Sequence, residues 1–152
     1  MKNEQTIRDK QFMSVALEQA RIGRTPYGCV ISDGRQVMVS AYNTVIKDKD
    51  PTAHAEINAI RLLSKEPTYG EKNLTLYSTA EPCPMCMSAI IYAGIHRVVF
   101  GVNIVEISRF QDQIRISSGD VVSAGFEQIE IIAGVMYEEC LNLFKTKDHD
   151  QR

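Results

Sequence analysis

Apolar side chains recur along the chain with two kinds of spacing, one typical of helices and one typical of strands. From Phe12 onward they fall on one helical face, Thr6 can cap the start of this helix, and Gly23 can end it. Two short apolar stretches follow, at residues 29–31 and 37–39, and the Asp-Gly dipeptide between them is a strong hairpin signal. The first forty residues therefore predict a helix and an antiparallel hairpin.

The rest of the chain alternates between helical and strand-like segments. Pro84 stands at the start of a predicted helix. It suits that position, because the N–H that proline lacks would have no helical partner in the first turn. The last eight residues are polar and are expected to fray. The predicted helices are residues 53–65, residues 84–94 and a segment from about Val135, and the predicted strands are residues 73–78, 97–100 and 128–132.

This order of elements indicates an α/β fold. Strand–helix alternation favours a single sheet covered by helices on both faces. The first two strands form an antiparallel hairpin, whereas strands joined through a helix run parallel. We therefore expect residues 1–152 to form one domain, a three-layer α/β/α sandwich with a mixed sheet.

The composition is that of an ordinary globular protein, with 44% hydrophobic and 24% charged residues. No apolar run is long enough to cross a bilayer. The segment that begins with Met1 lacks the apolar core of a signal peptide. We therefore expect a soluble cytoplasmic protein and no association with membranes.

The net charge of −2 is unevenly distributed, with +2 over residues 1–75 and −4 over residues 76–152. Proteins that bind nucleic acid usually carry a basic surface, because contacts with phosphates supply much of their affinity. The chain shows no such basic segment. A small-molecule substrate is favoured, and tRNA stays as the less favoured partner.

Two motifs carry the candidate chemistry: His54-Ala-Glu56, and Cys83 with Cys86 in a Pro-Cys-Pro-Met-Cys run. One imidazole and two thiolates supply three zinc ligands, and catalytic zinc sites typically keep the fourth position for water. Glu56 is then available to move that water's proton. An H-x-E motif followed by P-C-x-x-C is the pattern of zinc-dependent nucleobase deaminases.

Spacing constrains where such a metal can lie. Residues two apart in the middle of a helix point to nearly opposite sides, so His54 and Glu56 can serve one metal only beyond the N-terminal end of their helix. Cys83 and Cys86 also fall at the start of a predicted helix. Two helix N-termini would meet at the metal, and their dipoles favour the thiolate forms.

Each motif alone has other interpretations. A single C-x-x-C is often a redox pair or half of a zinc knuckle, and a histidine at a helix start is often a cap or a surface group. A redox motif has no reason to pair with an upstream H-x-E, so the two motifs together favour catalytic zinc. Cys29 and Cys140 are expected to be plain buried thiols.

Over residues 12 to 144 the chain resembles the cytidine deaminase superfamily, in its branch of guanine deaminases and tRNA adenosine deaminases. The matching text is PYGCV at 26–30, Asn43, PTAHAE at 51–56, LYSTAEPCPMC at 76–86 and RVVFG at 97–101. The resemblance implies a five-stranded mixed sheet of order 2-1-3-4-5. It also implies a homodimer with the active site near the interface.

The resemblance also implies roles for individual residues. Zinc would be held by His54, Cys83 and Cys86, and Glu56 would be the proton carrier. Asn43 would hydrogen-bond the base or its sugar, although a turn residue at the hairpin exit is the alternative. Further contacts would come from the backbone N–H of Ala55 and the backbone C=O of Ala80.

The departures from the family pattern concern the substrate. Residues 102–120 replace the glycine- and serine-containing loop of tRNA adenosine deaminases. Within them, Phe110 and Asp112 resemble the aromatic-plus-acid segment of guanine deaminases, although Asp112 as a solvated loop acid is an equal alternative. Tyr27 stands where the family more often has Phe or Val, and its ring can stack on a base.

Three hypotheses follow. The first is a zinc-dependent hydrolase that deaminates a free nucleobase or nucleoside, with guanine as the preferred candidate in purine metabolism. The second is a tRNA wobble-adenosine deaminase, which must flip its base out of an anticodon loop. The third is a zinc-binding module without activity, which requires a fourth protein ligand and no role for Glu56.

Overall fold

The sheet has five strands in the order β2-β1-β3-β4-β5. The computed structural model describes residues 2–70 and 73–146. β1 pairs antiparallel with β2 and β3, and the β3–β4 and β4–β5 pairs are parallel. The predicted mixed sheet and its order are therefore confirmed. The strands are β1 Gly28–Ser32, β2 Val37–Tyr42, β3 Thr75–Ala80, β4 Arg97–Val102 and β5 Glu130–Ala133.

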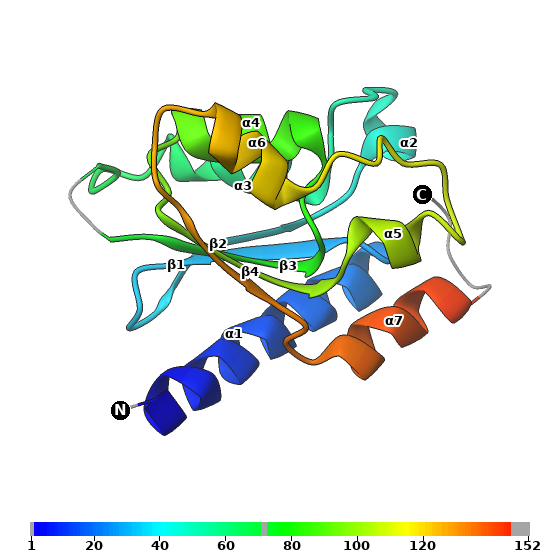
Figure 1. The fold of residues 1–152 in the computed structure, drawn as a ribbon, viewed down its shortest axis with the longest axis horizontal. Helices are drawn as coiled ribbons and strands as arrows, with labels where there is room; N and C mark the ends of the chain where they lie inside the picture. Colours follow the sequence, from blue (N-terminus) through cyan, green and yellow to red (C-terminus); the bar gives the residue numbers. More distant parts are fainter. Residues whose placement is uncertain (1, 71–72, 147–152) are drawn as a thin grey trace.

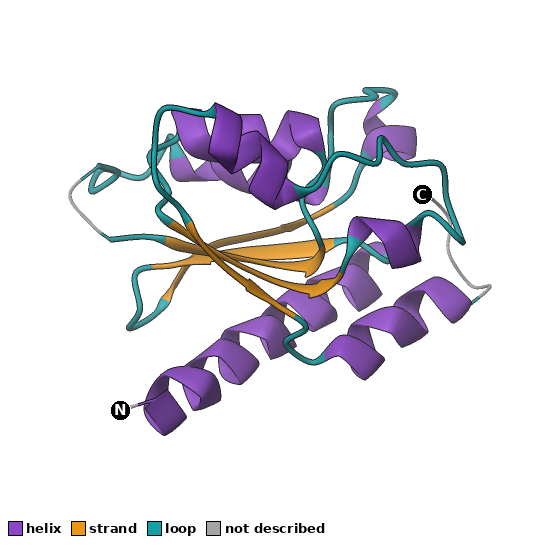
Figure 2. Cartoon of the chain, in the orientation of Figure 1, coloured by secondary structure: helices purple, strands orange, loops and turns teal. Residues whose placement is uncertain are grey.

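Helices cover both faces of this sheet, as Figures 1 and 2 show. α1 (Lys2–Gly23) and α7 (Tyr137–Lys145) lie on one face, and α3 (Ala55–Leu63), α4 (Pro84–Tyr92) and α6 (Ser118–Ala124) lie on the other. Two short helices, α2 (Val45–Asp48) and α5 (Ile104–Ile107), follow β2 and β4. The arrangement is the expected three-layer sandwich.

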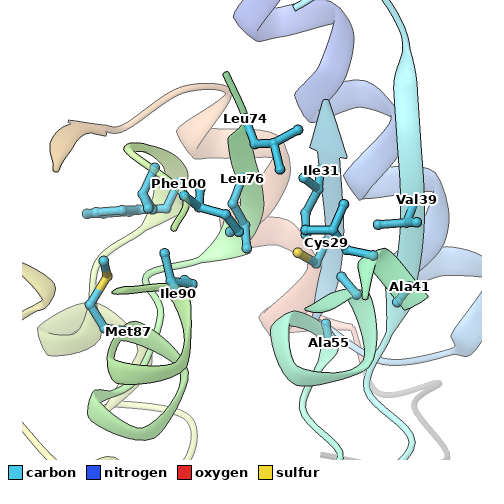
Figure 3. Close-up of a cluster of buried hydrophobic side chains, with 14 of the residues drawn as sticks. Cys29, Ile31, Val39, Ala41, Ala55, Leu74, Leu76, Met87, Ile90 and Phe100 are labelled. Atoms are coloured by element: carbon cyan, nitrogen blue, oxygen red, sulfur yellow. The ribbon is translucent and has the colours of Figure 1, made fainter. Parts of the chain in front are cut away.

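Alternating residues of β1, β3 and β4 supply the two cores. In β1, Cys29 and Ile31 face the α3–α4 side, drawn in Figure 3, whereas Val30 faces the α1–α7 side. In β3, Leu76 faces the α3–α4 side and Tyr77 faces the α1–α7 side. This alternation follows from the two-residue period of a strand, so both faces of the central strands must be apolar.

The hairpin between β1 and β2 forms at the predicted Asp-Gly. Gly34 has a φ of +88°, which suits a glycine. The Asp33 Oδ1 accepts hydrogen bonds from the backbone N–H groups of Arg35 and Gln36, each at 2.9 Å. The side chain thus satisfies backbone donors that the tight turn leaves without a ladder partner.

The structure corrects several predicted boundaries. Thr6 is not a cap, because it lies inside α1 and its hydroxyl donates to the Lys2 carbonyl oxygen at 3.0 Å. The prediction placed the third and fifth strands two residues too early. The last helix starts at Tyr137, because Met136 before it has a φ of +52°. Of the tail expected to fray, residues 147–152 lie outside the described residues.

None of the described helices combines the length and apolar composition that crossing a membrane would require. Both cysteines expected to be plain thiols, Cys29 and Cys140, are fully buried.

Candidate active site

Two helix starts bring the candidate ligands together. His54 is the residue before α3, and its backbone is extended, with φ −65° and ψ 157°. Cys83 is the residue before α4, with φ −64° and ψ 168°, and Pro84 begins the helix. Cys86 lies in the first turn of α4. The predicted meeting of two helix N-termini is therefore observed.

The three side chains form a compact cluster. The His54 Nδ1 lies 3.6 Å from the Cys83 Sγ and 3.5 Å from the Cys86 Sγ. A tetrahedral zinc ion with usual bond lengths would place a sulfur and a nitrogen ligand about 3.6 Å apart. The donor set and its spacing therefore fit zinc. Within residues 2–70 and 73–146, this is the one His/Cys/Asp/Glu group whose ligand atoms converge in this way.

The protein groups around Cys83 favour its thiolate. A hydrogen bond from Cys86, opposed by burial and supported by His54, lowers the pKa of Cys83 to about 4. The neighbouring thiolate and burial in turn raise the pKa of Cys86. The hydrogen bond with Cys83 raises the pKa of His54. A cation between these groups would relieve the repulsion between two thiolates, because it interacts favourably with both.

Glu56 lies in the first turn of α3 beside this cluster. Its side chain is buried, with a relative exposure of 5%. Burial and, second, the nearby Cys83 thiolate raise the pKa of Glu56. The Ser78 hydroxyl of β3 donates to the Glu56 Oε1 at 3.5 Å. A carboxyl group with a raised pKa that is not needed as a ligand is suited to accept and return a proton.

A cavity of about 390 Å³ opens next to the cluster and Glu56. Four predicted contact residues line it, namely Tyr27, Asn43, Ala80 and, from the segment after α5, Asp112. No lysine or arginine is among its lining residues in the described part of the chain. The described cavity wall therefore carries no basic patch.

Asn43 combines the two roles considered for it. It is buried, its Oδ1 accepts a hydrogen bond from the Val45 N–H at 2.9 Å, and the residue lines the cavity. It is thus both a turn residue after β2 and a neighbour of the candidate ligands. Ala55 differs, because its side chain is fully buried in the core and only its backbone lies at the helix start.

Gln111, Gln113, Glu81 and Met85 are among the cavity residues that sequence reasoning missed. The Tyr27 hydroxyl donates to the Gln111 Oε1 at 2.6 Å, and the Gln113 Nε2 lies 3.5 Å from the same hydroxyl. Glu81 lies two residues before Cys83, and Met85 lies between Cys83 and Cys86. Neither Glu81 nor the glutamines carried a local signal, because their contacts are with residues distant along the chain.

Comparison with known proteins identifies the family. A family model for the cytidine and deoxycytidylate deaminase zinc-binding region matches residues 6–102. The chain belongs to this family. Zinc is therefore its cofactor, and the chain is an enzyme of the hydrolytic C–N deaminase class.

Individual relatives act on different substrates. A tRNA-specific adenosine deaminase of Buchnera aphidicola subsp. Baizongia pistaciae is 36% identical over 143 residues, which cover 91% of this chain and 86% of that protein. A probable cytosine deaminase of Schizosaccharomyces pombe is 33% identical over 138 residues, covering 87% and 85%. The family membership therefore leaves the substrate open.

Solved structures agree with the fold. A tRNA:A34 deaminase structure, from a study of A-to-I editing at the wobble position, superposes with a TM-score of 0.72 at 29% identity, covering 88% of this chain and 98% of that one. A guanine deaminase from Nitrosomonas europaea superposes with a TM-score of 0.76 at 19% identity, covering 90% and 82%. The second likeness concerns the fold alone.

Proposed function

We propose that the chain hydrolyses the exocyclic amino group of a nucleobase or nucleoside, with guanine as the first candidate. Water adds to the ring carbon that bears the amino group, the C–N bond breaks, and a ring carbonyl and ammonia are formed. The observation that carries this proposal is the buried Glu56 beside the His54, Cys83 and Cys86 cluster at one end of the cavity.

In this proposal each residue has one task. His54, Cys83 and Cys86 hold zinc, which when bound supplies a Lewis acid that makes water a stronger nucleophile near neutral pH. Glu56 takes the proton that the water loses and passes it to the ring nitrogen. It then takes the second proton, from the hydroxyl group now on the ring carbon, and delivers it to the amino group, which leaves as ammonia. Its raised pKa supports this role, because surroundings that stabilise the protonated carboxyl group help it to hold a proton between the two transfers.

The walls of the cavity would hold the base. We assign to Asn43 a hydrogen bond with the base or its sugar, and to Tyr27 a stacking or edge contact with the ring. The Ala55 N–H and the Ala80 C=O would contact the reacting end, the latter towards the leaving amino group. The carboxylate of Asp112 would accept a ring N–H.

Two features support a free base, guanine first. The exposed Asp112 on the cavity wall is an acceptor, and guanine offers ring N–H donors to it. The described cavity wall contains no basic side chain for a phosphate backbone. A carboxylate at the same wall would repel phosphates. The homodimer and the cytoplasmic location expected from the sequence stay predictions.

A second substrate, the wobble adenosine of tRNA, has one observation in its favour. The sequence relative that is 36% identical across 91% of this chain is a tRNA-specific adenosine deaminase. Such a substrate would need contacts with phosphates outside the cavity, for which the exposed Arg109 and Arg115 are available. Its activity would then fall steeply with added salt.

The test is ammonia release by the zinc-loaded protein on a panel of substrates. The panel contains guanine, cytosine, guanosine, adenosine and an anticodon stem-loop with a wobble adenosine. We expect turnover of guanine, and a fall in kcat of about 10²–10⁴-fold in Glu56→Gln with the zinc content unchanged. The matched control is Glu106→Gln, which removes a carboxylate outside the cavity and should keep full activity.

The outcomes separate the candidates. Inosine formation only in the stem-loop would replace guanine by the tRNA substrate. Zinc-loaded protein without turnover on the whole panel, or a Glu56→Gln variant as active as the wild type, would contradict the proposed reaction.

A further inference from the structure

Glu81 is a buried carboxylate with an unusual set of partners. It is 8% exposed and lies two residues before Cys83. Its Oε2 accepts a hydrogen bond from the Ile104 N–H at 2.7 Å. Its Oε1 accepts from the Ser118 N–H at 2.9 Å and from the Ser118 hydroxyl at 2.8 Å. One side chain thus satisfies three buried donors.

These partners stand at the two ends of one segment. Ile104 begins α5 and Ser118 begins α6, and we call residues 104–118 the wall segment. The middle of the wall segment, residues 111–114, lines the same cavity as His54, Glu56 and Cys83. Glu81 therefore closes a loop whose tip forms part of the candidate substrate site. Its backbone N–H also donates to the Val102 carbonyl at 2.7 Å, so the start of the segment is held twice.

Helix capping alone does not explain Glu81. α5 has its own side-chain cap, because the Asn103 Oδ1 accepts from the Glu106 N–H at 2.9 Å. α6 has another, because the Ser117 Oγ accepts from the Asp120 N–H at 3.0 Å. What Glu81 adds is a link between the two helix starts and the loop that carries Cys83.

The tip of the wall segment has a second attachment. The Tyr27 hydroxyl bonds Gln111 at 2.6 Å, and the ring of Phe110 lies 5.9 Å from that of Phe144, which contacts the Tyr27 ring at 5.4 Å. Glu81 thus links both ends of the wall segment to the zinc-site loop, which carries Cys83. Tyr27, the residue before β1, holds the tip of the segment. A wall held at both ends and at its tip has a defined distance to the reacting centre.

We propose that Glu81 is a positioning residue that sets substrate selectivity by fixing the wall segment relative to the zinc-site loop. The proposal rests on the proposed function, because selectivity presupposes a substrate. Glu81 itself touches neither substrate nor metal in this account. It acts through residues 111–114.

The test is Glu81→Gln, which keeps the shape of the side chain but replaces one acceptor oxygen by an NH₂ group. That group must face either the Ile104 N–H or the Ser118 donors, so one link is lost. We expect an unchanged zinc content and faster amide hydrogen exchange across residues 111–114. We also expect a KM higher by about tenfold, a smaller change in kcat, and a selectivity ratio between the best and second-best base that moves towards one.

Two further variants keep the test decisive. Glu106→Gln makes the same chemical change inside the wall segment without a link to Glu81, and it should leave exchange, KM and selectivity unchanged. If Glu81→Gln fails to fold, Ser118→Ala removes only the hydroxyl donor and should shift the same quantities in the same direction, by less. A purely structural role would lower stability and the active fraction but leave KM and selectivity as in the wild type.

Failure of the proposal is distinguishable from failure of the proposed function. Loss of zinc from Glu81→Gln, or unchanged exchange at residues 111–114, would overturn the positioning role without any activity measurement. Wild-type protein inactive on every base would overturn the proposed function. Hydrogen exchange would then still test whether Glu81 holds the wall segment in place. Faster exchange with wild-type KM and selectivity would overturn the claim about selectivity.

Discussion

Glu56 and Asp9 are both buried carboxyl groups, and their surroundings move their pKa values in opposite directions. Burial raises the pKa of Glu56, which suits a group that must take up a proton. Burial also acts to raise the pKa of Asp9, but hydrogen bonds from Arg97, Gln5 and Tyr77 outweigh it, so its pKa is lowered. Asp9 therefore stabilises the fold as an anion.

This contrast predicts how the fold responds to acid. Arg97 donates to both Asp9 oxygens, at 2.8 and 2.7 Å, and the Tyr77 hydroxyl donates to the Oδ1 at 2.8 Å. Since the folded pKa lies below the unfolded one, this stabilisation is present above the unfolded pKa of about 3.9 and is lost as the pH falls through the folded value. Asp9→Asn should lower the free energy of unfolding at pH 7 by about 2 kcal/mol.

Urea unfolding of the wild type and of Asp9→Asn at pH 7, 5 and 3 measures the gap between their free energies of unfolding. The gap should be similar at pH 7 and 5 and should narrow at pH 3, because the Asp9 carboxylate of the unfolded chain takes up a proton below about pH 3.9. Glu4→Gln, an exposed change on the same helix, should show almost no gap at any pH. A gap for Asp9→Asn that stays constant down to pH 3 would contradict the role of the anion.

At the scale of residues, the sequence predicted which side chains come together only where the local backbone determines their position. His54, Cys83 and Cys86 each stand at a helix start, and a helix start is readable from Pro, spacing and caps. The partners of Glu81 lie 23 and 37 residues away, and Gln111 lies 84 residues from Tyr27. Such contacts depend on how the elements pack, which no local pattern encodes.

At the scale of elements, the packing of α1 on β1 depends on a missing side chain. A Cβ on Gly28 would lie 1.9 Å from the Ala16 carbonyl oxygen and 2.7 Å from the Ala20 nitrogen, both backbone atoms of α1. The helix lies against the strand at a distance that only glycine permits.

Gly28→Ala should therefore destabilise the fold, because backbone atoms cannot rotate away. We expect a loss of at least about 1–3 kcal/mol in the free energy of unfolding, measured by urea denaturation. Gly119→Ala in α6 is the matched control, since its Cβ would come no closer than 3.8 Å to the Ser117 Oγ. The control should be neutral or slightly stabilising; equal stabilities of the two variants would show that α1 can move away freely.

Long elements were predicted well and short ones were not. α3, α4 and the β1–β2 hairpin carry periodic apolar residues and clear start or turn signals. α2 and α5 have four residues each, too few to show a helical period, and α6 has seven. The starts of α5 and α6 depend on single capping side chains and on Glu81, so the sequence predicted no helix between β4 and β5.

At the scale of the whole molecule, topology explains why the site forms where it does. Asn43, Cys83 and the wall segment follow the carboxyl ends of β2, β3 and β4, and Tyr27 precedes the amino end of the antiparallel β1. All four therefore reach the same edge of the sheet, where α/β folds commonly bind ligands. The sheet order that produces this was implied by the family resemblance. The substrate was left open because the sequence did not place the wall segment relative to the cavity.

The central claim is that three side chains hold zinc and that Glu56 is not a ligand. X-ray absorption at the zinc edge of the protein purified without chelator tests it most directly. The account predicts one zinc per chain with two sulfur neighbours at about 2.3 Å and two nitrogen or oxygen neighbours at about 2.0–2.1 Å, unchanged in Glu56→Gln. A third sulfur, a coordination shell that changes in Glu56→Gln, or protein without metal would contradict it.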